Sequence, residues 1–190
     1  MDEQLQHRLD QIFDKVTTDD FVSGKGLGNE IGFFIFDYPP EHEIAVRNHV
    51  EFLLQRIGRN TQLKVTCIDL FALIVDHLKE RGLLEKSIEL EKAKGSEGLL
   101  KALKAPLKAE SLVRIFIEKA KPAEHDLVFI TGVGNAYPIV RSHSLLNNLQ
   151  PVMEDTPLIL FYPGRYDGQT VQLFGKLTSS PYYRAFRLIP

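Results

Sequence analysis

Apolar and polar positions alternate at the start of the chain with the period of an α-helix. The apolar positions are Leu5, Leu9, Ile12, Phe13 and Val16. Their spacing predicts an amphipathic N-terminal helix within residues 1–20.

Four short apolar runs follow, each with the length of a buried strand. They occupy residues 31–36, 63–69, 127–131 and 157–162. A nearly uninterrupted apolar run is typical of a strand that both faces of a parallel sheet bury. Helical patterns separate the runs, and the alternation predicts an α/β fold with three layers and a mostly parallel sheet.

Proline and glycine suggest where some of these helices begin and end. Pro138 is expected to open a helix over 138–149, and Gly58 is expected to cap the helix that follows the first strand. Residues 83–121 have a helical pattern with interruptions near Gly95 and Pro106, which we interpret as a helical insertion.

Two more strands are expected near the end of the chain, at about 170–175 and 182–188. Their short connections favour an antiparallel edge on the parallel sheet. We therefore expect residues 1–190 to form a single α/β domain.

Composition narrows the class of protein. Apolar residues make up 44% and charged residues 25% of the chain, as in soluble globular proteins. No uncharged apolar run approaches the ~20 residues that span a bilayer, and the acidic N-terminus lacks the pattern of a signal peptide. The single cysteine, Cys67, cannot form an internal disulfide. We expect a cytoplasmic protein without a membrane partner.

The glycine turn after the third apolar run is a candidate anion site. Gly132 and Gly134 supply two glycines of a dinucleotide fingerprint, but Tyr137 takes the third position and no acidic residue follows about 20 residues later. A following helix N-terminus could still hold an anion. The predicted anion-binding residues are Gly132, Gly134, Asn135, Arg141, Ser142 and His143. A turn that merely reverses the chain remains the alternative.

The usual catalytic patterns are missing from the sequence. Where a P-loop would follow the first strand, residues 38–41 read Tyr-Pro-Pro-Glu, which removes backbone donors and repels phosphate. No G-x-S-x-G elbow surrounds Ser142. His42 and His49 lie two helical turns apart, too far to share one metal ion. We expect no enzymatic activity, no cofactor and no metal site.

Tyrosines and arginines gather in the C-terminal part of the chain. They are Tyr162, Arg165, Tyr166, Tyr182, Tyr183, Arg184 and Arg187. Both residue types are enriched in protein interfaces, and together they can also bind single-stranded nucleic acid. The pI of about 6.3 and the lack of a recognised motif favour a protein interface.

A long C-terminal run is similar to a known family. The run FITGVGNAYPIVRSHSLLNNLQPVMEDTPLILFYPGRYDGQTVQLFG, the tail YYRAFRL and the upstream GLGNEIGFFIFDYPPEHE resemble the BrxB family of BREX (bacteriophage exclusion) phage-defence systems. The likeness extends over the whole chain and makes residues 126–190 its signature region.

The resemblance implies a bacterial defence protein encoded beside a methyltransferase, an ATPase and the alkaline-phosphatase-like protein PglZ. It brings no catalytic residues with it. It implies a non-catalytic interaction or scaffold subunit, with PglZ as the first candidate partner and other BREX subunits after it. A core like that of a P-loop NTPase without its phosphate loop would fit this expectation. A regulatory nucleotide or anion binder using residues 132–143 and a nucleic-acid binder using the C-terminal strands are the alternatives.

Overall fold

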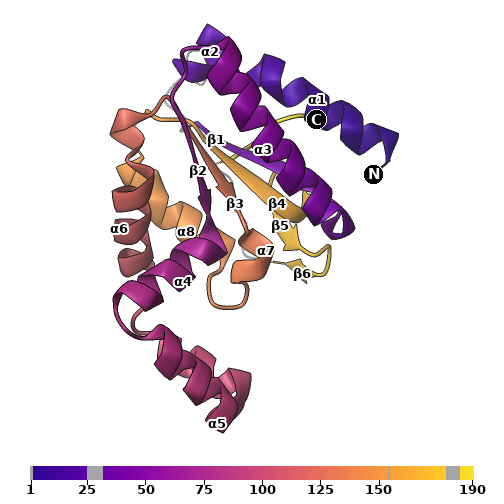
Figure 1. Cartoon of the computed structure of the whole chain (residues 1–190). Coiled ribbons are helices and arrows are strands. Elements are labelled where there is room, and N and C mark those ends of the chain that lie inside the picture. The colour runs from indigo at the N-terminus through magenta and orange to yellow at the C-terminus, as the bar shows by residue number, and fades with distance from the viewer. Residues whose placement is uncertain (1, 25–31, 154, 179–184) are drawn as a thin grey trace.

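A parallel sheet forms the centre of the molecule (Figure 1). Its order is β2 (Val65–Asp69), β3 (Leu127–Thr131), β4 (Leu158–Tyr166), β1 (Phe33–Tyr38) and β7 (Phe186–Arg187). The computed structural model describes residues 2–24, 32–153, 155–178 and 185–190, and within them each neighbouring pair in this row is parallel. The predicted α/β fold with a mostly parallel sheet is confirmed.

Helices cover both faces of the sheet (Figure 1). One face carries α1 (Glu3–Val16), α2 (Asp19–Val22) and α3 (Glu43–Asn60), and the other carries α4 (Leu70–Glu80), α6 (Ala109–Ala120) and α8 (Ser142–Leu149). The strand order accounts for this division. From β1 the chain crosses past β4 and β3 to reach β2 at one edge of the sheet. The next two connections, from β2 to β3 and from β3 to β4, run in the opposite direction across the sheet. Because parallel crossovers are right-handed, connections that run in opposite directions place their helices on opposite faces. Short 3-10 turns lie at η1 (Pro40–His42), η2 (Pro122–Glu124) and η3 (Gln150–Val152).

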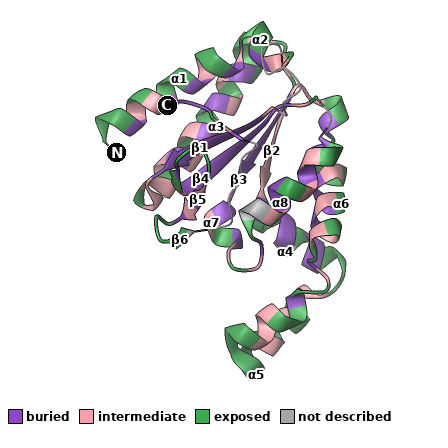
Figure 2. Cartoon of the chain, turned by 180° about the vertical axis from the view of Figure 1, so that it is seen from behind, coloured by how far each residue is buried: buried purple, intermediate pink, exposed green. Residues whose placement is uncertain are grey.

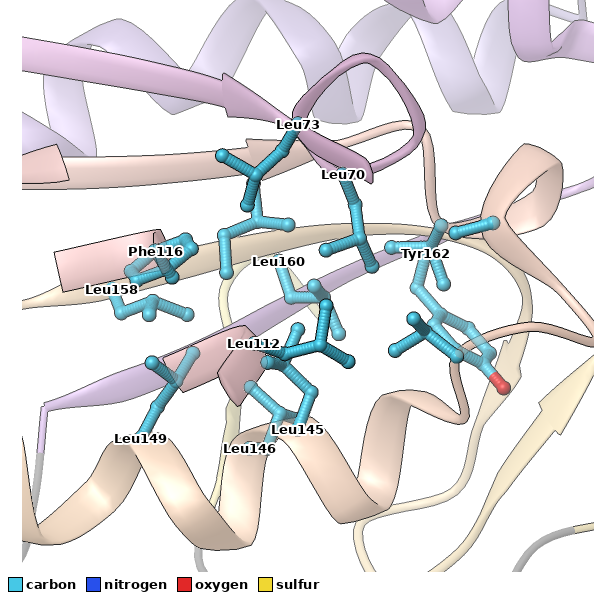
Figure 3. Packing of buried hydrophobic residues seen from close by; sticks show 14 of the residues in the cluster. Leu70, Leu73, Leu112, Phe116, Leu145, Leu146, Leu149, Leu158, Leu160 and Tyr162 are labelled. Carbon is cyan, nitrogen blue, oxygen red and sulfur yellow. The ribbon is translucent and has the colours of Figure 1, made fainter. Parts of the chain in front are cut away.

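The central strands are buried on both sides, as Figure 2 shows. In β1, Phe33 and Ile35 belong to the core beneath α4, α6 and α8, whereas Phe34 and Phe36 belong to the core beneath α1 and α3. Figure 3 shows the first of these cores, with Leu112 and Leu145 among its side chains. Burial on both faces explains why these strands read as continuous apolar runs in the sequence.

The first part of the helical insertion forms an arm that projects from the body, whereas α6 packs on the sheet (Figure 1). The arm consists mainly of α5 (Leu84–Leu103), which breaks at Gly95, where φ is 67° and ψ is 179°. Leu103 is the buried residue of this helix. The predicted interruption near Gly95 is confirmed.

The C-terminal part agrees with the prediction in one respect and differs in another. The strands β5 (Val171–Leu173) and β6 (Leu177–Thr178) form the expected antiparallel edge on the end of β4. The expectation of an antiparallel strand within 182–188 is wrong, because β7 runs parallel to β1. This pairing provides hydrogen-bond partners for backbone groups on the outer edge of β1, where the N–H of Leu188 donates to the carbonyl of Ile35 at 2.9 Å.

Two helix boundaries also differ from the sequence prediction. Pro138 follows a cis peptide bond and opens no helix, since a short helix, α7 (Val133–Ala136), comes before it and α8 begins at Ser142. Gly58 lies inside α3, and Thr61 closes that helix by donating its N–H to the carbonyl of Ile57 at 2.9 Å. In the described part of the chain, none of the helices has the length and apolar character needed to cross a membrane.

Candidate functional site at the carboxyl edge of the sheet

Ligands of open α/β sheets bind beyond the carboxyl ends of the strands, where the connections leave towards opposite faces. Here β1 leads into α3 on one face and β3 leads into α8 on the other, with β4 between them, so that point lies around the carboxyl end of β4. We call the side where β1, β2, β3 and β4 end the carboxyl edge.

Asp37, near the end of β1, accepts hydrogen bonds from several separate parts of the chain. Arg8 of α1 donates from Nη2 to its Oδ1 at 2.9 Å and from Nη1 to its backbone carbonyl at 2.9 Å. The N–H of Tyr166 donates to Oδ2 at 3.0 Å, and Arg187 Nη2 lies 3.5 Å from the same oxygen. The same guanidinium of Arg8 donates to the carbonyl of Ile189 at 3.1 Å. The buried carboxylate therefore joins both ends of the chain to the sheet.

A second polar network joins the end of β1 to the end of β2. The hydroxyl of Tyr38 donates to Glu43 at 2.7 Å, and Glu43 lies 3.8 Å from Arg47 on the next turn of α3. Arg47 in turn pairs with Asp69, which caps α4 by accepting from the N–H of Ala72 at 2.9 Å. Burial raises the pKa of Tyr38, and the Glu43 carboxylate adds to this shift, so the phenol stays protonated as a donor. These carboxylates are thus occupied by internal partners.

The turn after β3 passes directly beside Asp69. Gly132 adopts a φ of 71°, and a Cβ at this position would lie 2.4 Å from Asp69 Oδ1. Glycine is therefore required both for the backbone conformation and for the close approach. Two residues later, a Cβ on Gly134 would lie 3.0 Å from the ring of Phe174. The hairpin of β5 and β6 thus covers the glycine turn.

The predicted anion-binding residues are divided between two helices. Gly132, Gly134 and Asn135 belong to the covered turn and α7, whereas exposed Arg141 precedes α8. Ser142 and His143 form the first turn of α8, and their side chains lie outside the described set. Anion binding by these residues stays a prediction.

The residues of the predicted partner interface also do not form one exposed group among the described residues. Tyr162 and Tyr166 are only 1% and 0% exposed, so the prediction that they face a partner is corrected. The hydroxyl of Tyr166 donates to the carbonyl of Ala185 at 2.7 Å, inside the fold. Arg165 is exposed, and so is Arg187, which lies beside Asp37. Tyr182, Tyr183 and Arg184 lie outside the described residues.

Sequence reasoning missed a group of exposed apolar side chains at this edge. Ile44 at the start of α3 is 76% exposed, and Phe71 at the start of α4 is 39% exposed. On the hairpin, Phe174 is 37% and Leu177 is 39% exposed. Ile44 stands outside the apolar stripe of α3, which was the available indication in the sequence, whereas Phe71 is spaced like the buried Ile74 and Leu78 and gave no such indication. Together with Arg165, the four exposed apolar residues are called the carboxyl-edge surface.

Comparison with known proteins decides the family. The family model described as "BREX protein BrxB" matches residues 66–188. A BREX protein BrxB of Bacillus cereus (strain H3081.97) is 42% identical over 190 residues, covering 98% of both chains. The chain belongs to the BrxB family. A BREX protein BrxB of Escherichia coli O9:H4 (strain HS) is 43% identical, covering 100% of this chain and 94% of its own length.

The family match confirms the resemblance inferred from the sequence motifs. The region that the BrxB model matches begins in β2 and ends just after β7, so it contains the glycine turn and the hairpin. The BrxB relatives also align with the preceding part, which holds α1, β1 and α3. No solved structure matches the chain.

Proposed function

We propose that this BrxB family protein is a non-catalytic interaction subunit of a cytoplasmic BREX antiviral defence complex. The relatives are named BREX proteins, which supports membership of that system. The observation that carries the interaction role is that the carboxylates at the carboxyl edge already pair with internal groups. Asp37 is held by Arg8, Arg187 and the Tyr166 N–H, so the usual catalytic position of such a sheet is used for internal support.

The carboxyl-edge surface provides suitable chemistry for a protein partner. Phe71 and Phe174 offer exposed aromatic area, and Arg165 has no ion pair among the described residues. Aromatic residues and arginine contribute disproportionately to the energy of protein interfaces. PglZ is the proposed partner, because the family resemblance implies that it is encoded beside this protein, and an acidic surface on it would complement Arg165.

Co-purification with PglZ from the same operon tests this proposal. We expect the tagged chain to retain PglZ at micromolar concentration and the Arg165→Glu variant to retain several-fold less. Arg59→Glu is the matched control, because Arg59 is also exposed but lies in the last turn of α3, at the opposite end of that helix from the carboxyl edge. Failure of the unaltered chain to retain PglZ would exclude PglZ as the partner. Equal loss in both variants would exclude a role specific to Arg165.

A further inference from the structure

A cavity of about 360 Å³ lies where the arm joins the body. Three segments enclose it, namely the end of α5 with the residues that follow it, the start of α6, and the stretch 138–145 that leads into α8. The cavity is separate from the carboxyl-edge surface, since none of its lining residues belongs to that group. Its volume falls within the range of about 300–1,000 Å³ that is usual for small-molecule sites.

The wall of this cavity is aliphatic. Its buried members are Leu103, Leu107, Leu112, Val140 and Leu145. Leu112 and Leu145 also belong to the core between the helices and the sheet, as Figure 3 shows, so the cavity reaches down to that core. The lining described by the structure includes neither an aromatic ring nor a carboxylate. Such a wall suits an alkyl chain, and it offers no platform on which a nucleobase would stack.

Two cations and the hydroxyl residue Ser144 also line the cavity. Lys104 and Arg141 are both exposed, in contrast to the buried aliphatic residues beside them. Neither forms an ion pair with a carboxylate in the described part of the chain. Arg141 also stands at the N-cap of α8, where its own side chain makes no capping hydrogen bond and the helix dipole adds positive potential. The cavity therefore combines an apolar interior with a positively charged margin.

We propose that this cavity binds an amphipathic anion, with an alkyl body against the leucines and one carboxylate-type head at Lys104 and Arg141. The two cations come from different parts of the fold, because Lys104 follows the arm and Arg141 precedes α8. A bound anion consequently joins the arm to the body. This site is independent of partner binding at the carboxyl edge.

Titration calorimetry with decanoate tests the site directly, with 1-decanol as the neutral probe of equal chain length and ATP as a nucleotide probe. We expect one saturable decanoate site and at least five-fold weaker binding of 1-decanol, because the alcohol lacks the charge that the two cations attract. We also expect slower amide exchange in residues 97–104 when decanoate is bound. ATP is expected to bind more weakly than decanoate.

Variants locate the site within the fold. Arg141→Ala and Lys104→Ala should each raise the Kd of decanoate at least five-fold, and Ala109→Trp should remove binding by filling the cavity. Lys101→Ala is the matched control and should leave the Kd unchanged, since Lys101 is exposed on α5 but does not line the cavity. Melting temperatures confirm that each variant is folded. Absence of saturable decanoate binding up to 1 mM, equal affinity for 1-decanol, tighter binding of ATP, or unchanged binding in folded Arg141→Ala and Lys104→Ala would each overturn the proposal.

Discussion

Asp37 shows how one carboxylate can hold separate parts of this fold together. It is nearly buried and pairs with Arg8, whose side chain is only 16% exposed. Removing one partner of such a pair leaves a charge with neither water nor a counterion, which costs far more than the pair contributes. The structural importance of Asp37 therefore lies mainly in its pairing with Arg8, the less exposed of its two arginine partners.

Replacement of Asp37 tests this reasoning. We expect Asp37→Asn to lower the free energy of unfolding in urea by about 2–4 kcal/mol, because Arg8 loses its counterion. The control is Arg187→Ala, which removes a 3.5 Å contact from a side chain that is 37% exposed. Its expected cost is under about 1 kcal/mol. Equal losses in the two variants would contradict the assigned role of Arg8 and Asp37.

Gly164 provides a second test at the residue scale. A Cβ at this position would lie 2.1 Å from the backbone carbonyl oxygen of Gln172, so Gly164→Ala must displace β5 from β4. We expect a loss of about 2 kcal/mol or more in urea unfolding, as for other overpacked sites. Gly58→Ala is the matched control, because nothing lies within 4 Å of its Cβ and α3 is helical there. That change should stabilise the protein by up to about 1 kcal/mol. Similar effects from both substitutions would refute the close approach of the two strands.

Cys67 is expected to be an unreactive thiol. Burial in β2 raises its pKa to about 11, although a hydrogen bond with Thr131 opposes the shift. A raised thiol pKa keeps the protonated form below pH 11, so at pH 8 the thiolate fraction is about a hundred-fold lower than for a pKa of 9. Labelling with a thiol reagent should be slow in the folded protein, should keep accelerating beyond pH 9, and should become fast in urea. A rate that levels off below pH 9 in folded protein would show that the pKa is not raised.

At the scale of the elements, the sequence predicts the position of a strand best where both faces of that strand are buried. The strand expected at 127–131 coincides with β3, because its neighbours on both sides and both helical layers demand apolar residues. The direction of β7 could not be predicted, since it depends on the free edge of β1, far away in sequence. Likewise, Tyr162 and Tyr166 share a face of β4 with each other, but the pattern alone does not reveal that this face is covered.

The α5 arm should be the least stable helix of the protein. Only Leu103 within it is fully buried, and Figure 2 shows mostly exposed and intermediate residues along its length. Amides open locally where few apolar contacts hold an element. In native-state hydrogen exchange we expect α5 to exchange at least a hundred-fold faster than β3, which serves as the internal reference. Comparable protection in the two elements would mean that the arm is held by contacts not seen in this structure.

At the scale of the whole molecule, we assign separate roles to two regions of the fold. The carboxyl edge holds the internal carboxylate networks and the exposed carboxyl-edge surface, whereas the cavity lies between the arm and the body. The candidate site was only partly predictable. Arg165 could be identified from the sequence. Ile44 and Phe174 could not be assigned to one surface, because they are far apart in the sequence and only the fold brings their segments to the same edge.

Hydrogen exchange of the full chain with and without purified PglZ is the sharpest test of partner binding at the carboxyl-edge surface. We expect PglZ to slow exchange in the segments that carry the carboxyl-edge surface, around residues 43–47, 70–74 and 164–177, and to leave residues 56–61 at the far end of α3 unaffected. Saturating binding with protection confined to residues 56–61, or no protection in any segment, would contradict this expectation.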